Sequence, residues 1–194
     1  MQELRNLTDA IWINILMVVT SIPIVTVGAA ITAAHDANRR ALQGEAGGVT
    51  RNYFKAFRAN FAESTALWAV FGITGAALAY AWVVLQITPL LVPKIGLTLV
   101  WIIGFEWVFA LQARFENAVG RTLANAFVFG ISHILLTVGM IVLDAIWVGL
   151  LAACWFLFPQ GLFLLVVMGY GTMILCHIPL LERGFAQYLK SGEE

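Results

Sequence analysis

Two carboxylates lie inside long apolar stretches of the sequence, where an ionisable group is costly to bury. Glu106 lies about two turns inside the stretch 95–113, and Asp144 lies near the middle of 132–155. A charged side chain at the centre of a bilayer costs at least about 2.5–3.5 kcal/mol on insertion scales. Two interpretations remain open: a polar cluster that lines a solute path or carries a proton, or structural contacts in which neighbouring helices donate hydrogen bonds to each carboxylate.

The three histidines, His35, His133 and His177, fall toward the same end of their apolar stretches. A three-histidine metal site would require all three to meet over long sequence separations, and no HxxxH or HxxE motif supports one. We therefore expect interfacial or helix-capping roles for them, with no metal and no cofactor. His133 and His177 join Glu106 and Asp144 as intramembrane polar candidates.

Motifs that carry catalysis are absent from the sequence. It contains no GxxxxGK[ST] phosphate loop and no GxSxG, HExxH or CxxC motif. The two carboxylates have no accompanying nucleophile, so no catalytic residue is assigned and we expect a protein that is not an enzyme.

The composition excludes a soluble globular domain. The chain is 61% hydrophobic and 11% charged, whereas soluble domains carry roughly 25% charged residues. The net charge is zero, which gives no basis for binding nucleic acid. The lipid bilayer is therefore the first expected partner.

The apolar stretches predict an all-α, polytopic transmembrane bundle that forms one membrane domain over residues 1–194. We predict five spans, with six as the alternative, over about 10–34, 64–87, 95–113, 132–155 and 162–181. Pro23 should kink the first span. The apolar stretch 122–158 is too long for one span; we favour one helix whose first turns, 123–131, protrude or lie at the interface.

The segment 44–63 is the longest hydrophilic part of the chain and predicts an amphipathic helix. Its aromatic and basic residues fall on opposite sides, as in a helix that lies in a membrane interface; they are Tyr53, Phe54, Phe57 and Phe61 against Arg51, Lys55 and Arg58. The alternative is a helix packed under a soluble domain, for which the flanking apolar stretches leave little material.

The basic residues are distributed unevenly between the two sides of the predicted bundle. Nine of the eleven lie in the segment after the first span, in the break between the third and fourth spans, and in the C-terminal tail. By the positive-inside rule this side is cytoplasmic, which predicts a multi-pass protein of the bacterial cytoplasmic membrane with its N-terminus outside and its C-terminus inside.

The first third of the chain contains a recognisable set of positions: Asn14, Pro23, Thr26, Gly28 and Thr32, followed by the aromatic series from Tyr53 to Phe61. With these positions it resembles the YesL family, small bacterial membrane proteins with a domain of unknown function (624). Family members are often encoded beside carbohydrate ABC importer components, so the resemblance implies an accessory membrane subunit in sugar uptake. It supplies no catalytic residue.

Two functions follow as expectations. The first is a non-enzymatic accessory subunit that binds an importer's permease or ATPase through the basic, aromatic helix. The second is a small transporter or channel that uses Glu106 and Asp144. Small residues between 72 and 79 also suit close helix packing, which leaves self-association open.

Overall fold

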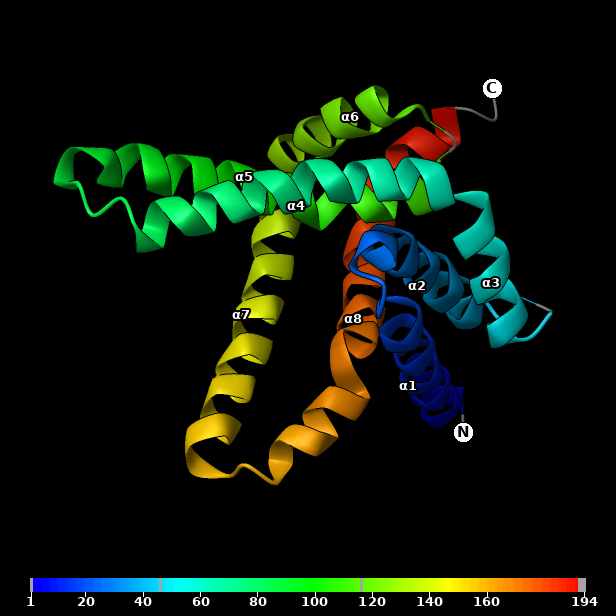
Figure 1. The fold of residues 1–194 in the computed structure, drawn as a ribbon. Helices are drawn as coiled ribbons and strands as arrows, with labels where there is room; N and C mark the ends of the chain where they lie inside the picture. The colour runs from blue at the N-terminus through cyan, green and yellow to red at the C-terminus, as the bar shows by residue number, and fades with distance from the viewer. Residues whose placement is uncertain (1, 46, 116, 192–194) are drawn as a thin grey trace.

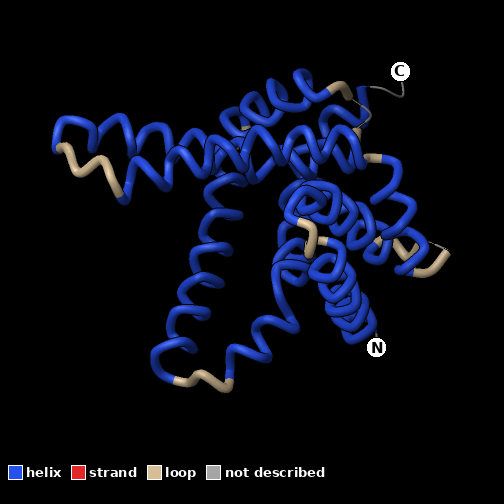
Figure 2. Tube along the Cα trace, viewed as in Figure 1, coloured by secondary structure: helices blue, strands red, loops and turns tan. Residues whose placement is uncertain are grey.

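The computed structural model describes residues 2–45, 47–115 and 117–191, and helices account for nearly all of them (Figures 1 and 2). The predicted all-α fold is confirmed, and the described residues contain no strand. The α-helices are α1 (Gln2–Thr20), α2 (Val27–Leu42), α3 (Val49–Ala59), α4 (Phe61–Val83), α5 (Leu91–Arg114), α6 (Val119–Ser132), α7 (Ile134–Leu157) and α8 (Gly161–Ser191). Two short 3-10 turns, Ile24–Thr26 and Thr88–Leu90, precede α2 and α5.

Four helical segments are long and apolar enough to cross a membrane: Phe61–Val83, Thr88–Arg114, Ile134–Leu157 and Gly161–Ala186. They form two hairpins, α4–α5 and α7–α8, whose tips extend in different directions (Figure 1). Large apolar side chains are exposed along both hairpins, and such surfaces suit contact with lipid rather than water. The protein is therefore a helical membrane protein, and four of the five predicted spans correspond to these segments.

The predicted continuous span over 10–34 is wrong. The chain leaves the helix after Thr20 and folds back, so that α1 and α2 pack side by side as an antiparallel pair. Arg5 and Asp9 in the first half of α1 consequently line the same cavity as Ala41, which lies in the last turn of α2. Pro23 is the physical reason, because it lacks an amide hydrogen and interrupts the helical hydrogen bonds; the sequence predicted a kink there, and the structure has a reversal.

The long apolar stretch 122–158 also differs from the prediction. A break at His133, with φ −115° and ψ 46°, separates α6 from α7, so the first turns form a helix of their own instead of extending the span. Thr137 stabilises the break by donating its hydroxyl hydrogen to the Gly130 carbonyl at 2.9 Å. The indole N–H of Trp107 on α5 donates to Thr137 Oγ1 at 2.9 Å, so a tertiary contact fixes a boundary that no proline or charge marks.

Helix α2 is the most buried element and packs against α1, α3, α4, α5 and α8. A methyl group on Gly28 would collide with the backbone carbonyl of Ser64 and the Cβ atom of Trp68. One turn later, the hydroxyls of Thr32 and Ser64 share a buried hydrogen bond of 2.8 Å. Small side chains on α2 therefore allow α4 to approach closely.

Helix α8 is broken at Gly169, whose φ of 51° and ψ of −170° are not helical. Glycine occupies this position because a positive φ is unfavourable for other L-residues. Asn14 on α1 satisfies the backbone groups that the break frees. Its side-chain amide donates to the carbonyls of Val166 and Val167, and its oxygen accepts a hydrogen bond from the Gly171 amide.

Candidate functional site

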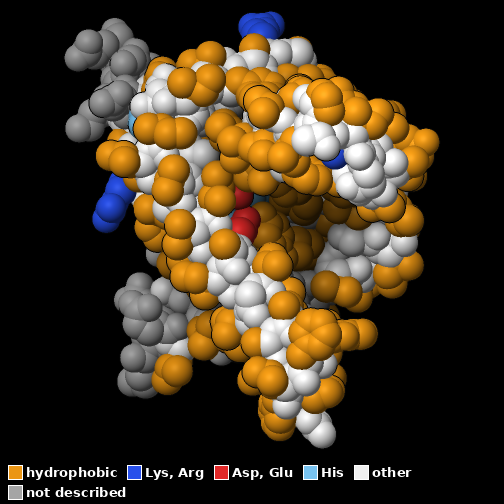
Figure 3. Space-filling view, turned by 90° about the vertical axis from the view of Figure 1, so that its left-hand side faces the viewer, with side chains coloured by type: hydrophobic (Ala, Val, Ile, Leu, Met, Phe, Trp, Pro, Cys, Tyr) orange, Lys and Arg blue, Asp and Glu red, His pale blue; other side chains and the backbone are white. Residues whose placement is uncertain are grey.

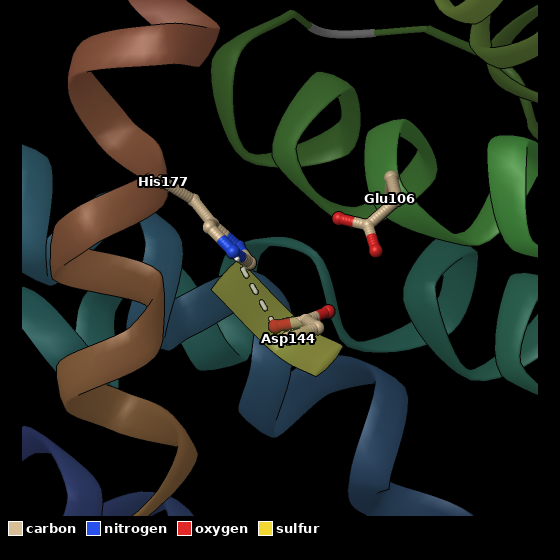
Figure 4. Close-up of side chains that lie close together, drawn as sticks. All are labelled: Glu106, Asp144 and His177. Carbon is tan, nitrogen blue, oxygen red and sulfur yellow. Dashed lines mark ion pairs between the residues drawn. The ribbon is translucent and has the colours of Figure 1, made fainter. Parts of the chain in front are cut away.

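Three ionisable side chains from three different helices converge where α5, α7 and α8 meet (Figure 4). They are Glu106 on α5, Asp144 on α7 and His177 on α8, and one donor atom from each lies within 4.8 Å of the other two. His177 Nε2 and Asp144 Oδ1 are 3.4 Å apart. The sequence predicted all three as polar candidates, and the structure brings them together as one cluster, which we call the carboxylate–histidine cluster.

The cluster is buried, yet several of its polar atoms have no hydrogen-bond partner. Glu106 and His177 are 7% and 2% exposed. Glu106 Oε2, Asp144 Oδ1 and His177 Nε2 are all buried and make no hydrogen bond to the described residues. Because buried polar groups in native proteins are nearly always satisfied, unpartnered atoms that face one another require an explanation.

Asp144 connects the cluster to the surface, since its side chain is 27% exposed. Figure 3 shows a hollow lined mainly by hydrophobic side chains, with acidic side chains at its edge. Two carboxylates and an imidazole can hold a cation or share a proton. The geometry supports both chemistries and favours neither by itself.

The three histidines do not form a common site among the described residues. His133 lies at the α6–α7 break, where its ring stacks on Phe129 and lies near Trp107. His35 on α2 is 7% exposed; burial, with a smaller contribution from nearby His177, lowers the pKa of His35 from 6.5 to about 3. His35 is therefore neutral at physiological pH, and only His177 belongs to the cluster.

The family-motif positions have structural roles in the described chain. Asn14 satisfies the break in α8, and Gly28 and Thr32 form the close α2–α4 contact. Thr26 stabilises the turn around Pro23 by donating its hydroxyl hydrogen to the carbonyls of Thr20 and Pro23, at 2.5 and 2.6 Å. None of these residues belongs to the carboxylate–histidine cluster.

The predicted amphipathic helix is α3, and its aromatic side faces the protein more than the sequence suggested. Tyr53 is fully buried, and its hydroxyl shares a hydrogen bond of 2.6 Å with Thr20 of α1. Phe57 is half-buried and Phe54 is 37% exposed. Phe61, 41% exposed, is the first residue of α4, so the amphipathic helix is shorter than the predicted segment 44–63. The Tyr53–Thr20 contact could not be predicted from the sequence, because the contact depends on the reversal at Pro23.

The basic side of α3 is exposed and carries charges without described counter-ions. Arg51, Lys55 and Arg58 are exposed, and none of them forms an ion pair with a described residue. By contrast, Arg39 and Arg40 on α2 form ion pairs with Asp36 and Glu45. Lys55 also lines a polar cavity of about 760 Å³ together with Asp36, Arg39, Arg40, Glu63 and Arg114.

A comparison with protein families tests the resemblance to the YesL family. Residues 10–82 match the family model described as "Protein of unknown function, DUF624". The YesL resemblance is confirmed. The DUF624 match covers α2, α3, nearly all of α4 and most of α1, and the carboxylate–histidine cluster lies outside it. No curated protein and no solved structure matched the chain in the corresponding comparisons.

Proposed function

We propose that this protein is a non-enzymatic accessory subunit of a carbohydrate ABC importer in the bacterial cytoplasmic membrane. In this proposal the exposed basic side of α3 binds the permease or the ATPase. The observation that carries the proposal is the arrangement of α3: Tyr53 is buried at the α1–α2 hairpin, while Arg51, Lys55 and Arg58 face outward without ion pairs to described residues.

The anchoring of α3 makes its basic side a preformed surface. A helix fixed by a buried aromatic side chain loses little conformational freedom on binding, which lowers the cost of association. The three charges suit an acidic surface on a partner, and electrostatic complementarity of this kind favours specificity and fast encounter. The polar cavity beside Lys55 offers further hydrogen-bonding groups at the edge of the same surface.

The proposed orientation places α3 in the cytoplasm. With four spans, the N-terminal ends of α4 and α7 face the cytoplasm. The C-terminal ends of α5 and α8 face the same side, together with the C-terminus of the chain. The predicted outside location of the N-terminus depended on one continuous span over 10–34, and the hairpin removes that support; we now place the N-terminus on the cytoplasmic side. Ten of the eleven basic residues then lie inside and only Lys94 lies outside, a stronger asymmetry than five spans gave.

Affinity purification from solubilised membranes of the native host tests the proposal. We expect the wild-type protein to recover ABC importer components, and the triple variant Arg51→Glu, Lys55→Glu, Arg58→Glu to lose them. The matched control is Arg121→Glu with Arg183→Glu, which reverses exposed charges on α6 and α8. Wild-type protein that recovers no ABC component in several mild detergents would contradict the proposal, as would equal recovery by the triple variant.

A second candidate function is a small transporter or channel, and the carboxylate–histidine cluster favours it. Buried ionisable groups in spanning helices commonly mark ion or proton pathways. Uptake of candidate sugars into proteoliposomes tests this function, with Asp144→Asn as the variant. Uptake equal to that of empty vesicles, and unaffected by Asp144→Asn, would exclude it.

A further inference from the structure

The carboxylate–histidine cluster has the composition and spacing of a metal site. Glu106, Asp144 and His177 come from three helices, and their donor atoms lie within 4.8 Å of one another. Glu106 and His177 are more than nine-tenths buried, and each directs an unpartnered polar atom into the cluster. This arrangement differs from an exposed acidic patch, in which water satisfies the carboxylates.

Bound cations relieve the repulsion between ionised carboxylates, and the charges of the cluster suit such a partner. Two carboxylates this close repel each other, and a low-dielectric environment strengthens the repulsion. A single imidazole can offset at most one of the two negative charges. A divalent cation would neutralise both carboxylates and would also provide the missing partner for Glu106 Oε2, Asp144 Oδ1 and His177 Nε2.

We propose that Glu106, Asp144 and His177 bind a divalent transition-metal ion of the Zn²⁺ type. Ligands at about 2.0–2.2 Å from a tetrahedral zinc ion lie about 3.4 Å apart. The separation of His177 Nε2 and Asp144 Oδ1, 3.4 Å, already has this value. Glu106, with a ligand atom within 4.8 Å of the other two, would be the third protein ligand.

The donor set determines the class of metal. Imidazole nitrogen suits zinc and similar transition metals, whereas Ca²⁺ and Mg²⁺ prefer sites made wholly of oxygen. The fourth coordination position is left for water or a ligand reaching the partly exposed Asp144 side.

The metal site is independent of partner binding by α3, because it involves none of the residues on that helix. It is therefore tested on the purified full-length chain, without any importer component. Failure of the metal experiment would leave the accessory-subunit proposal intact, and failure of the pull-down would leave the metal site intact.

The experiment measures metal binding to chelator-treated protein in lipid nanodiscs. We expect about one equivalent of Zn²⁺ by elemental analysis after loading and desalting, and a tetrahedral-type absorption spectrum with Co²⁺. Glu106→Gln, Asp144→Asn and His177→Gln should each weaken binding at least 10-fold. The matched controls, His133→Gln and Glu182→Gln, alter a histidine and a carboxylate outside the cluster and should bind as the wild type does.

X-ray absorption at the zinc edge of the wild-type protein gives a measurement that does not depend on variants folding. We expect a first shell of nitrogen and oxygen ligands with one imidazole. Wild-type protein that retains no Zn²⁺ or Co²⁺ would overturn the proposal. A first shell without imidazole, or cluster variants that bind as tightly as the controls, would overturn the assigned ligands, and preference for Ca²⁺ or Mg²⁺ would overturn the metal class.

Discussion

Polar side chains are hydrogen-bonded in the segment that matches DUF624, whereas several in the carboxylate–histidine cluster are not. Within residues 10–82, the motif side chains are nearly all satisfied: Asn14, Thr26 and Thr32 make hydrogen bonds, and Gly28 allows close packing. In the carboxylate–histidine cluster, buried polar atoms face one another without hydrogen bonds. The matched segment therefore carries residues that pack the scaffold, whereas the ionisable cluster lies on helices outside that segment.

The contrast predicts that substitutions in the scaffold reduce stability and that substitutions in the cluster do not. Asn14→Leu should have the largest effect. It removes three hydrogen bonds at the α8 break and leaves buried backbone groups unsatisfied, which should lower the free energy of unfolding by about 3 kcal/mol. SDS titration in mixed micelles measures this change.

Asn6→Leu on the same helix is the matched control. Asn6 is also buried, but its side-chain oxygen has no described hydrogen-bond partner. An Asn14→Leu protein as stable as the Asn6→Leu protein would show that the amide does not hold the break in α8.

Gly28→Ala should have the next largest effect. The added methyl group meets the backbone carbonyl of Ser64, which cannot move without shifting α4. We expect a loss of about 2 kcal/mol from overpacking, measured by the same titration. Gly149→Ala on α7 is the control, because an added methyl group there meets no atom within 4 Å; equal stability of the two variants would refute the close α2–α4 contact.

His35 should make stability depend on pH. Burial lowers its pKa from 6.5 to about 3 in the folded protein, so the unfolded chain binds the proton more readily. The contribution of His35 to the free energy of unfolding is fully present above about pH 6.5. It falls as the pH drops toward 3, by up to about 1.4 kcal/mol per pH unit. Relative to His35→Gln, the wild type should lose about 1.4 kcal/mol of its free energy of unfolding between pH 7.5 and 5.5. If the free energies of unfolding of the two proteins changed equally over this range, a neutral buried His35 would be contradicted.

Asp144→Asn should have the smallest effect. Removing one of two neighbouring carboxylates relieves their repulsion, which offsets the loss of the 3.4 Å ion pair with His177. In the presence of a chelator, we expect a change within about 0.5 kcal/mol of the wild-type free energy of unfolding, or a gain. A loss comparable with that of Asn14→Leu would show that the cluster stabilises the scaffold as the motif residues do.

Much of the fold could be predicted from the sequence because its determinants are local. Apolar length identified the four spanning helices, and helical periodicity identified α3 as amphipathic. The errors arose where local patterns were ambiguous. A proline permits either a kink or a reversal, and the reversal at Pro23 is accompanied by packing of α1 against α2 and α8. The break at His133 depends on a hydrogen bond that Trp107, far away in sequence, donates to Thr137.

The candidate site shows the same division. Sequence alone determined that Glu106, Asp144 and His177 are costly residues in apolar helices, since hydrophobicity is a property of each segment. Only the tertiary structure decided that these three meet while His133 stacks on aromatic rings elsewhere. It also decided that Tyr53 is buried and that the basic side of α3 faces outward. Distances between residues on different helices depend on how those helices pack, and the spacing of residues along one helix does not encode that packing.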